Sequence, residues 1–123
     1  MSTHRDLDVY KLSVLFVRDI YKLTELFPKS EVYGLASQMQ RAAVSIPSNI
    51  SEGAARRGTR EFLHFLYISS SSASELETQL EVAELLGYIK DKVTYDKLNS
   101  SLGTVRMKLL AMIRSLEAKP LKN

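Results

Sequence analysis

A chain of 123 residues with 45% apolar and 25% charged residues is long enough to bury a core within one domain. Its lack of cysteine excludes disulfides and thiolate metal sites, and its net charge of +3 is only moderately basic. Apolar runs such as 14–17 are too short to span a bilayer, and no apolar signal segment precedes the first helical pattern, so we expect a cytoplasmic, bacterial-type protein with no membrane association.

The first predicted helix spans about 8–27. Its main apolar stripe recurs at steps of three and four residues, at Val9, Leu12, Phe16, Ile20, Leu23 and Phe27. A second apolar stripe runs beside it, at Tyr10, Val14, Val17 and Tyr21. A helix that is apolar over most of its girth needs cover on two sides, so we expect a contact with another copy of the chain in addition to the core.

The second predicted helix spans about 31–57, with Ser30 placed to cap its start and Gly58 placed to take a left-handed conformation at its end. Its core stripe consists of Val32, Leu35, Met39, Ala42 or Ala43, Ile46 and Ile50. Pro47 lies within this pattern and removes one backbone hydrogen bond. Small residues that include Gly53 should let a neighbouring helix approach closely.

The third predicted helix spans about 60–86, with Thr59 as its cap and Gly87 as its stop. Its apolar seam follows the heptad steps of helices that cross at a shallow angle, at Phe62, Leu66, Ser69, Ala73, Leu76, Leu80 and Ala83. The serine run 69–72 falls within this register. We therefore expect it to face the small residues near Pro47.

The fourth predicted helix spans about 95–118 and begins after Thr94 as its cap. The heptad rhythm continues in it at Tyr95, Leu98, Leu102, Val105, Leu109, Met112 and Leu116. Gly103 interrupts this helix at a cost of roughly 1 kcal/mol relative to alanine, so a packing reason for it is expected.

Four helices joined by short connections predict an all-α fold, an up-down-up-down antiparallel four-helix bundle, with residues 1–123 as a single domain. The residues expected to be buried are Phe16, Ile20, Ile46, Ile50, Phe62, Leu66, Leu76, Leu80, Leu102 and Leu109.

Patterns for catalysis or metal binding are incomplete. Glu61 and His64 form one Glu-x-x-His unit, whereas a di-iron bundle needs two such units and further glutamates, and the other histidine, His4, lies outside the helices. The glycine spacing of 53–59 resembles that of a phosphate-binding loop but lacks its lysine and follows a helix. No base is placed to activate the serine run. We therefore expect a protein that is not an enzyme, with no cofactor and no metal.

Charge is distributed unevenly along the chain. Residues 59–88 carry one Arg against five Glu, whereas residues 89–123 carry eight Lys or Arg against three acidic residues. The third and fourth helices can simply attract each other as neighbours. Alternatively, the two segments present an acidic face and a basic face to partners.

Several segments, in this order and spacing, resemble one family: DLDVYKLS, FPKSEVYGL, RAAVSIPSNISEGAARR, EFLHFLYIS and ASELETQLEVAELLGYI. They are similar to the four-helix-bundle proteins encoded within intervening sequences of bacterial 23S ribosomal RNA genes. The resemblance implies a small cytoplasmic bundle that assembles as a ring-like homopentamer, with RNA binding as the usual proposal for its function. It also implies kinship with the accessory variability protein of diversity-generating retroelements, a basic pentameric barrel that binds nucleic acid and a reverse transcriptase.

The leading hypothesis for function is an oligomer that binds structured RNA or DNA through backbone phosphates. The residues assigned to this role are Arg41, Arg56, Arg57, Arg60, Lys97 and Lys108. No aromatic residue lies within the basic segment ARRGTR, and Arg56 and Arg57 can alternatively act as helix-end charges that pair with Glu52 or Glu61.

The second hypothesis is a scaffold ring that docks a partner protein without binding nucleic acid. Its docking face would consist of Glu77, Glu81 and Glu84, which are spaced four and three residues apart.

Overall fold

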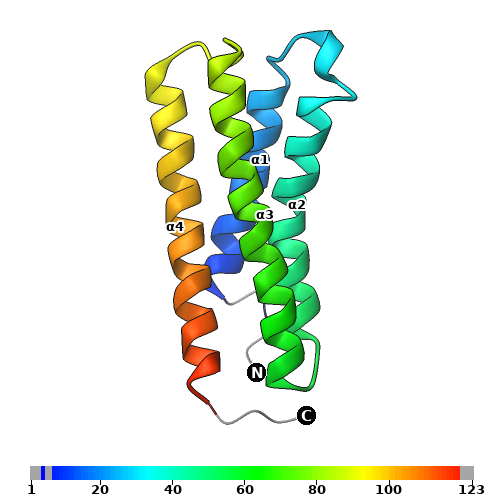
Figure 1. The fold of residues 1–123 in the computed structure, drawn as a ribbon, viewed down its shortest axis with the longest axis vertical. Coiled ribbons are helices and arrows are strands. Elements are labelled where there is room, and N and C mark those ends of the chain that lie inside the picture. The colour runs from blue at the N-terminus through cyan, green and yellow to red at the C-terminus, as the bar shows by residue number, and fades with distance from the viewer. Residues whose placement is uncertain (1–3, 5–6, 120–123) are drawn as a thin grey trace.

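The computed structural model describes His4 and residues 7–119. Its helices are α1 (Asp8–Thr24), the short 3-10 helix η2 (Lys29–Glu31), α2 (Leu35–Ala54), α3 (Thr59–Leu85) and α4 (Lys92–Glu117). The four long helices run alternately up and down side by side, so the predicted all-α bundle is confirmed (Figure 1). Among the neighbouring long helices, contacts are most extensive between α2 and α3 and sparsest between α1 and α4. No helix of the described residues is long and apolar enough to cross a membrane.

The core follows the predicted apolar stripes closely. Nine of the predicted residues are at most 2% exposed, namely Phe16, Ile20, Ile46, Ile50, Leu66, Leu76, Leu80, Leu102 and Leu109. The tenth, Phe62, is half-buried, and Leu63 beside it is buried instead. The Phe62 ring packs against Gly53 of α2, so it contributes to the α2–α3 interface although it is only half-buried. Two further positions depart from the predicted stripes: Val32 is 53% exposed because it precedes α2, and in α4 Ile113 is buried whereas Met112 is only partly buried. The helical period therefore predicted most of the core.

The connection between α1 and α2 is longer than the sequence pattern predicts. α1 ends at Thr24 rather than at 27, because the Phe27 N–H donates to the Thr24 carbonyl (3.1 Å) in a tight turn. The prediction that Ser30 caps the second helix is wrong, since α2 begins at Leu35 and not at 31. The cap comes from Glu31 in η2, whose Oε1 accepts the Leu35 N–H (3.0 Å). This bond holds the pKa of Glu31 below its usual value.

The connection between α2 and α3 is also shifted from the prediction. α2 ends at Ala54 rather than at 57, and Gly58 is extended (φ −99°, ψ 147°) rather than left-handed. Gly58 directly precedes α3, and its carbonyl accepts the Phe62 N–H (3.1 Å). Thr59 is therefore the first helical residue and not the cap.

Gly87 ends α3 as predicted. It has a φ of 82° and is the single left-handed residue in the part of the chain that the structure describes. The Tyr88 N–H donates to the Ala83 carbonyl (2.9 Å) and the Gly87 N–H to the Glu84 carbonyl (3.0 Å). These two bonds form a Schellman motif, which satisfies carbonyls at the helix end.

The residue that caps α4 is Asp91 and not Thr94. Its Oδ1 accepts the Thr94 N–H (2.7 Å) and its Oδ2 accepts the Thr94 hydroxyl (2.7 Å). Because both bonds favour the ionised carboxylate, they hold the pKa of Asp91 below its usual value. The helix consequently begins at Lys92, three residues before the predicted start at 95.

The predicted contact between the serine run and the region of Pro47 is confirmed. The Ser69 hydroxyl donates to the Ile46 carbonyl (2.8 Å), and the Ser72 hydroxyl donates to Ser45 Oγ (2.8 Å). Both serines are buried, so these bonds satisfy polar groups that the interface removes from water.

The two glycines that interrupt helices differ in their surroundings. A Cβ on Gly53 would lie 2.9 Å from Phe65 Cβ and 2.8 Å from Phe62 Cδ1, so the expected close approach of two helices is confirmed. A Cβ on Gly103 would meet no atom within 4 Å. The packing reason expected for Gly103 is therefore absent from the described chain.

Candidate nucleic-acid interface

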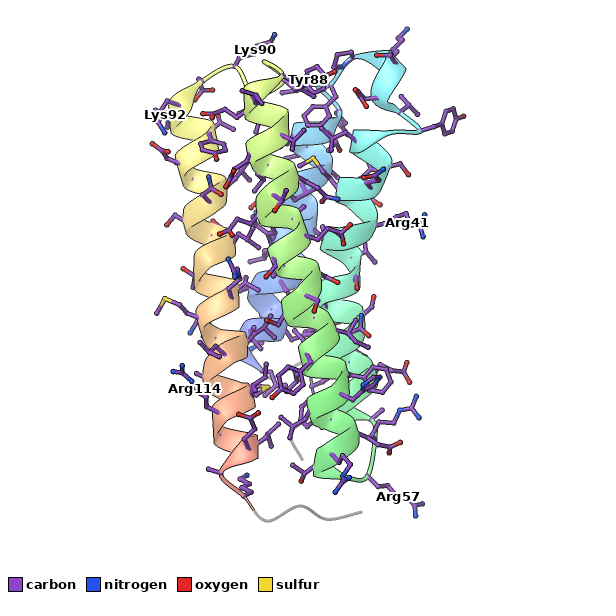
Figure 2. All side chains as sticks on the ribbon, viewed as in Figure 1. Arg41, Arg57, Tyr88, Lys90, Lys92 and Arg114 are labelled. Atoms are coloured by element: carbon purple, nitrogen blue, oxygen red, sulfur yellow. The ribbon has the colours of Figure 1, made fainter. Side chains whose placement is uncertain are left out.

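Three of the predicted site residues lie together at one end of the bundle. Arg56 and Arg57 follow the end of α2, and Arg60 is in the first turn of α3; we call these three residues the basic corner. All three are exposed, and Arg57 points away from the bundle at the tip of the connection (Figure 2). The Arg57 side chain makes no ion pair or hydrogen bond with any other described residue. The corner thus presents positive charge to solvent.

Arg56 is held by two neighbours. Its Nη2 pairs with Glu52 Oε2 (2.6 Å), and its guanidinium lies 5.0 Å from the centre of the Phe65 ring. The pairing with Glu52 agrees with one of the two alternatives that the sequence leaves open for this arginine. An exposed i,i+4 ion pair contributes only about 0.3–0.5 kcal/mol, so a phosphate can compete with Glu52 for the guanidinium.

Aromatic side chains lie next to the basic corner, contrary to what the segment ARRGTR by itself suggests. Arg60, His64 and Tyr67 are exposed on successive turns of α3, at helical spacings of four and three. With Leu63 and Glu117 they line a groove of about 380 Å³ between α3 and the end of α4. The Tyr67 hydroxyl donates to Glu117 Oε2, and this bond raises the pKa of Tyr67. Sequence reasoning missed this stripe, although its helical spacing is a local signal that could have found it.

Arg41 is not part of the corner. It projects from the outer face of α2 (Figure 2), about 20 Å by helical rise from Ala54, where α2 ends before the basic corner. It lies between two shallow grooves, one toward α1 with Tyr21 and Ser48 and one toward α3 with Glu75.

Lys97 and Lys108 also lie away from the corner, on the side of α4 that faces α1. Lys108 Nζ pairs with Asp8 Oδ2 (2.6 Å), and this hydrogen bond holds the pKa of Asp8 below its usual value. Lys97 lines a cavity of about 540 Å³ between α1 and α4, together with Asp19 and Lys22. The structure thus divides the predicted set of basic residues among three separate places.

The acidic residues assigned to a docking face are partly neutralised by α4. Glu77 Oε2 accepts a bond from Arg106 Nη1 (2.8 Å), and Glu84 lies close enough to Lys92 to raise the pKa of that lysine, after the larger effect of Asp96. Part of the uneven charge distribution is therefore explained by the pairing of acidic residues on α3 with basic residues on α4.

In the part of the chain that the structure describes, residues able to hold a metal do not gather in one place. No group of three or more His, Asp or Glu side chains within His4 and residues 7–119 is arranged to hold an ion. His64 instead packs edge-on against the Phe65 ring (5.2 Å between centres).

Comparison with known proteins supplies a family. The family model described as 23S rRNA-intervening sequence protein matches residues 5–111. A crystal structure of a protein of unknown function from the S23 ribosomal protein family of Bacteroides thetaiotaomicron is similar in fold, with a TM-score of 0.78 and 25% sequence identity. The similarity covers 85% of this chain and 97% of that chain. No protein with a curated description matches the chain significantly.

Proposed function

The chain belongs to the 23S rRNA-intervening sequence protein family, and from this premise we propose that it is a cytoplasmic, non-catalytic oligomer that binds structured RNA or DNA through backbone phosphates. The observation that carries the proposal is the exposed basic corner of Arg56, Arg57 and Arg60 at one end of the bundle. Guanidinium groups neutralise phosphates without reading sequence, so such a surface binds by charge and shape.

Assembly into a ring strengthens this proposal. Apolar side chains on the outer faces of α1 and α4 reach solvent in the single chain, among them Leu15 (47% exposed) and Met107 (73% exposed). Gly103, whose Cβ position contacts no described residue, lies in a shallow groove beside Met107 and Leu110. A homopentamer that covers such faces would repeat the basic corner around one rim. The summed field of that rim attracts phosphates more strongly than a net charge of +3 suggests.

The oligomeric state is a direct prediction. Light scattering on the purified protein at micromolar concentration should give a mass close to five times the 13.9 kDa of one chain. A stable mass of one chain across the concentration range would contradict the ring, and another multiple would retain the oligomer but not the pentamer.

Binding through the corner is tested by replacing Arg56, Arg57 and Arg60 with alanine. We expect affinity for RNA to fall similarly across sequences, and the slope of log affinity against log salt to flatten by about three, roughly one for each arginine that no longer pairs with a phosphate. The bundle should remain folded, because exposed charges at helix ends contribute only about 0.3–1 kcal/mol each. Fluorescence anisotropy at several salt concentrations measures the slope.

A matched control removes the same charge from the opposite end of the bundle. Lys29, Lys90 and Lys92 are exposed there, and their replacement by alanine should leave most of the affinity and the slope unchanged. If both triple variants bind RNA with the affinity and salt slope of the parent, the basic corner does not bind phosphates.

A scaffold that docks a partner protein is the alternative, and an exposed apolar end favours it. Tyr33 (97% exposed), Leu85 (86%) and Leu26 (77%) lie at the end of the bundle away from the basic corner. The test is purification of the native assembly. Recovery of a second protein in stoichiometric amount and without nucleic acid, with an affinity that depends only weakly on salt, would favour this function over RNA binding.

A further inference from the structure

The groove between α3 and α4 has a composition that backbone-phosphate binding does not explain. Its lining combines a cation (Arg60), two ring systems (His64 and Tyr67), an apolar floor (Leu63) and a carboxylate (Glu117). Its volume of about 380 Å³ lies at the lower end of the roughly 300–1,000 Å³ that small-molecule sites occupy.

Resting on the proposed function, we infer that this groove receives one unpaired nucleobase, so that the protein prefers single-stranded segments or loops to continuous duplex. The basic corner adjoins the groove, because Arg57 and Arg60 lie at the start of the helix that carries both rings. A strand whose phosphate contacts the corner can therefore place its base between α3 and α4. In a duplex the base is stacked and paired, and it cannot enter.

The rings supply a stacking wall. Tyr67 is 47% exposed, and His64 is one turn before it on the same face of α3. The bond from the Tyr67 hydroxyl to Glu117 fixes one end of the phenol, so the ring is held in place before a base arrives. Stacking on an ordered aromatic ring raises the affinity for every type of base, because every base has a π-face.

The carboxylate adds a preference among bases. Glu117 lines the groove and accepts the Tyr67 hydroxyl through Oε2, and a carboxylate can accept several hydrogen bonds at once. A carboxylate accepts hydrogen bonds from exocyclic amino groups, which adenine, cytosine and guanine carry. Uracil lacks this group and offers only its N3–H, which lies between two carbonyl oxygens that a carboxylate repels. The last turn of α4 reinforces this preference, because the carbonyl end of a helix attracts donors. The groove therefore favours amino-bearing bases over uracil.

The test compares binding of 12-nucleotide oligo(A) RNA, oligo(A) DNA, oligo(U) RNA and a mixed-sequence RNA duplex, by fluorescence anisotropy. Tyr67→Ala should weaken binding of both oligo(A) strands about tenfold, while duplex affinity and the salt slope stay unchanged. Tyr67→Phe keeps the ring and should retain most of the affinity. Tyr21→Ala, at a residue on α1 with 42% exposure, is the matched control and should have no effect.

Glu117→Gln tests the base preference, because an amide presents both a donor and an acceptor. It should bring oligo(U) binding to within about twofold of oligo(A) binding. Equal effects of Tyr67→Ala on duplex and single strands, or no effect on either, would overturn the base site while leaving phosphate binding at the corner intact. A parent protein that binds none of the four probes would overturn the proposed function itself. A weakening confined to the RNA strand would assign the contact to the 2′-hydroxyl and overturn stacking as its basis.

Discussion

Replacing Leu76 with alanine should lower the free energy of unfolding by about 2–5 kcal/mol, the usual range for a fully buried leucine. Leu76 lies in the middle of α3, is 0% exposed and belongs to the continuous core of the bundle. The truncation removes apolar packing and leaves a cavity that long, regularly packed helices cannot readily close. Urea unfolding at fixed protein concentration measures the decrease.

Leu85→Ala is the matched control, because Leu85 lies on the same helix and is 86% exposed. It should change the free energy of unfolding by no more than about 0.5 kcal/mol. If Leu76→Ala also lowers the free energy of unfolding by less than about 0.5 kcal/mol, the heptad seam does not form the core.

Gly53→Ala should destabilise the protein by up to about 2 kcal/mol, although alanine is the better helix former. The added Cβ would lie 2.9 Å from Phe65 Cβ and 3.2 Å from the Phe62 carbonyl oxygen. These atoms belong to or adjoin the backbone, so α2 and α3 must separate, and overpacking of this kind costs about 1–3 kcal/mol. Over nearly all of its range, that cost exceeds the gain of roughly 1 kcal/mol in helix propensity.

Gly103→Ala is the matched control for the same chemical change. Its Cβ would meet no atom of His4 or residues 7–119 within 4 Å, so helix propensity acts alone and should raise the free energy of unfolding by about 1 kcal/mol. The two variants should therefore shift the thermal midpoint in opposite directions. Stabilisation by Gly53→Ala would refute the close approach of α2 and α3, and destabilisation by Gly103→Ala would show that another copy packs against that face.

The candidate site divides into features that are visible in the sequence and features that are not. The segment ARRGTR places three arginines together because they are neighbours in the chain. Nothing local indicates that Lys108 pairs with Asp8, one hundred residues earlier, or that Glu117 bonds with Tyr67. Which cations remain open to a ligand depends on such distant partners.

The helices and their buried faces were determined by the sequence itself. The apolar period is a local property, and burial of one stripe per helix follows from it wherever the helices meet. Helix ends were less determined, because several residues near each end have side chains that can cap. Ser30 and Thr94 were plausible caps, yet Glu31 and Asp91 have the reach and direction that the actual connections require.

The tertiary structure alone decided the contacts between helices. The sequence shows that Gly53 and the serine run are small, but it does not give the distance between α2 and α3. That distance excludes even a methyl group at Gly53, and it lets the Ser69 hydroxyl reach the Ile46 carbonyl. It likewise brought Arg60, His64 and Tyr67 of α3 against Glu117 of α4 to form one groove. A local pattern fixes which face of a helix is buried, whereas the partner of each side chain depends on how the helices are positioned against one another.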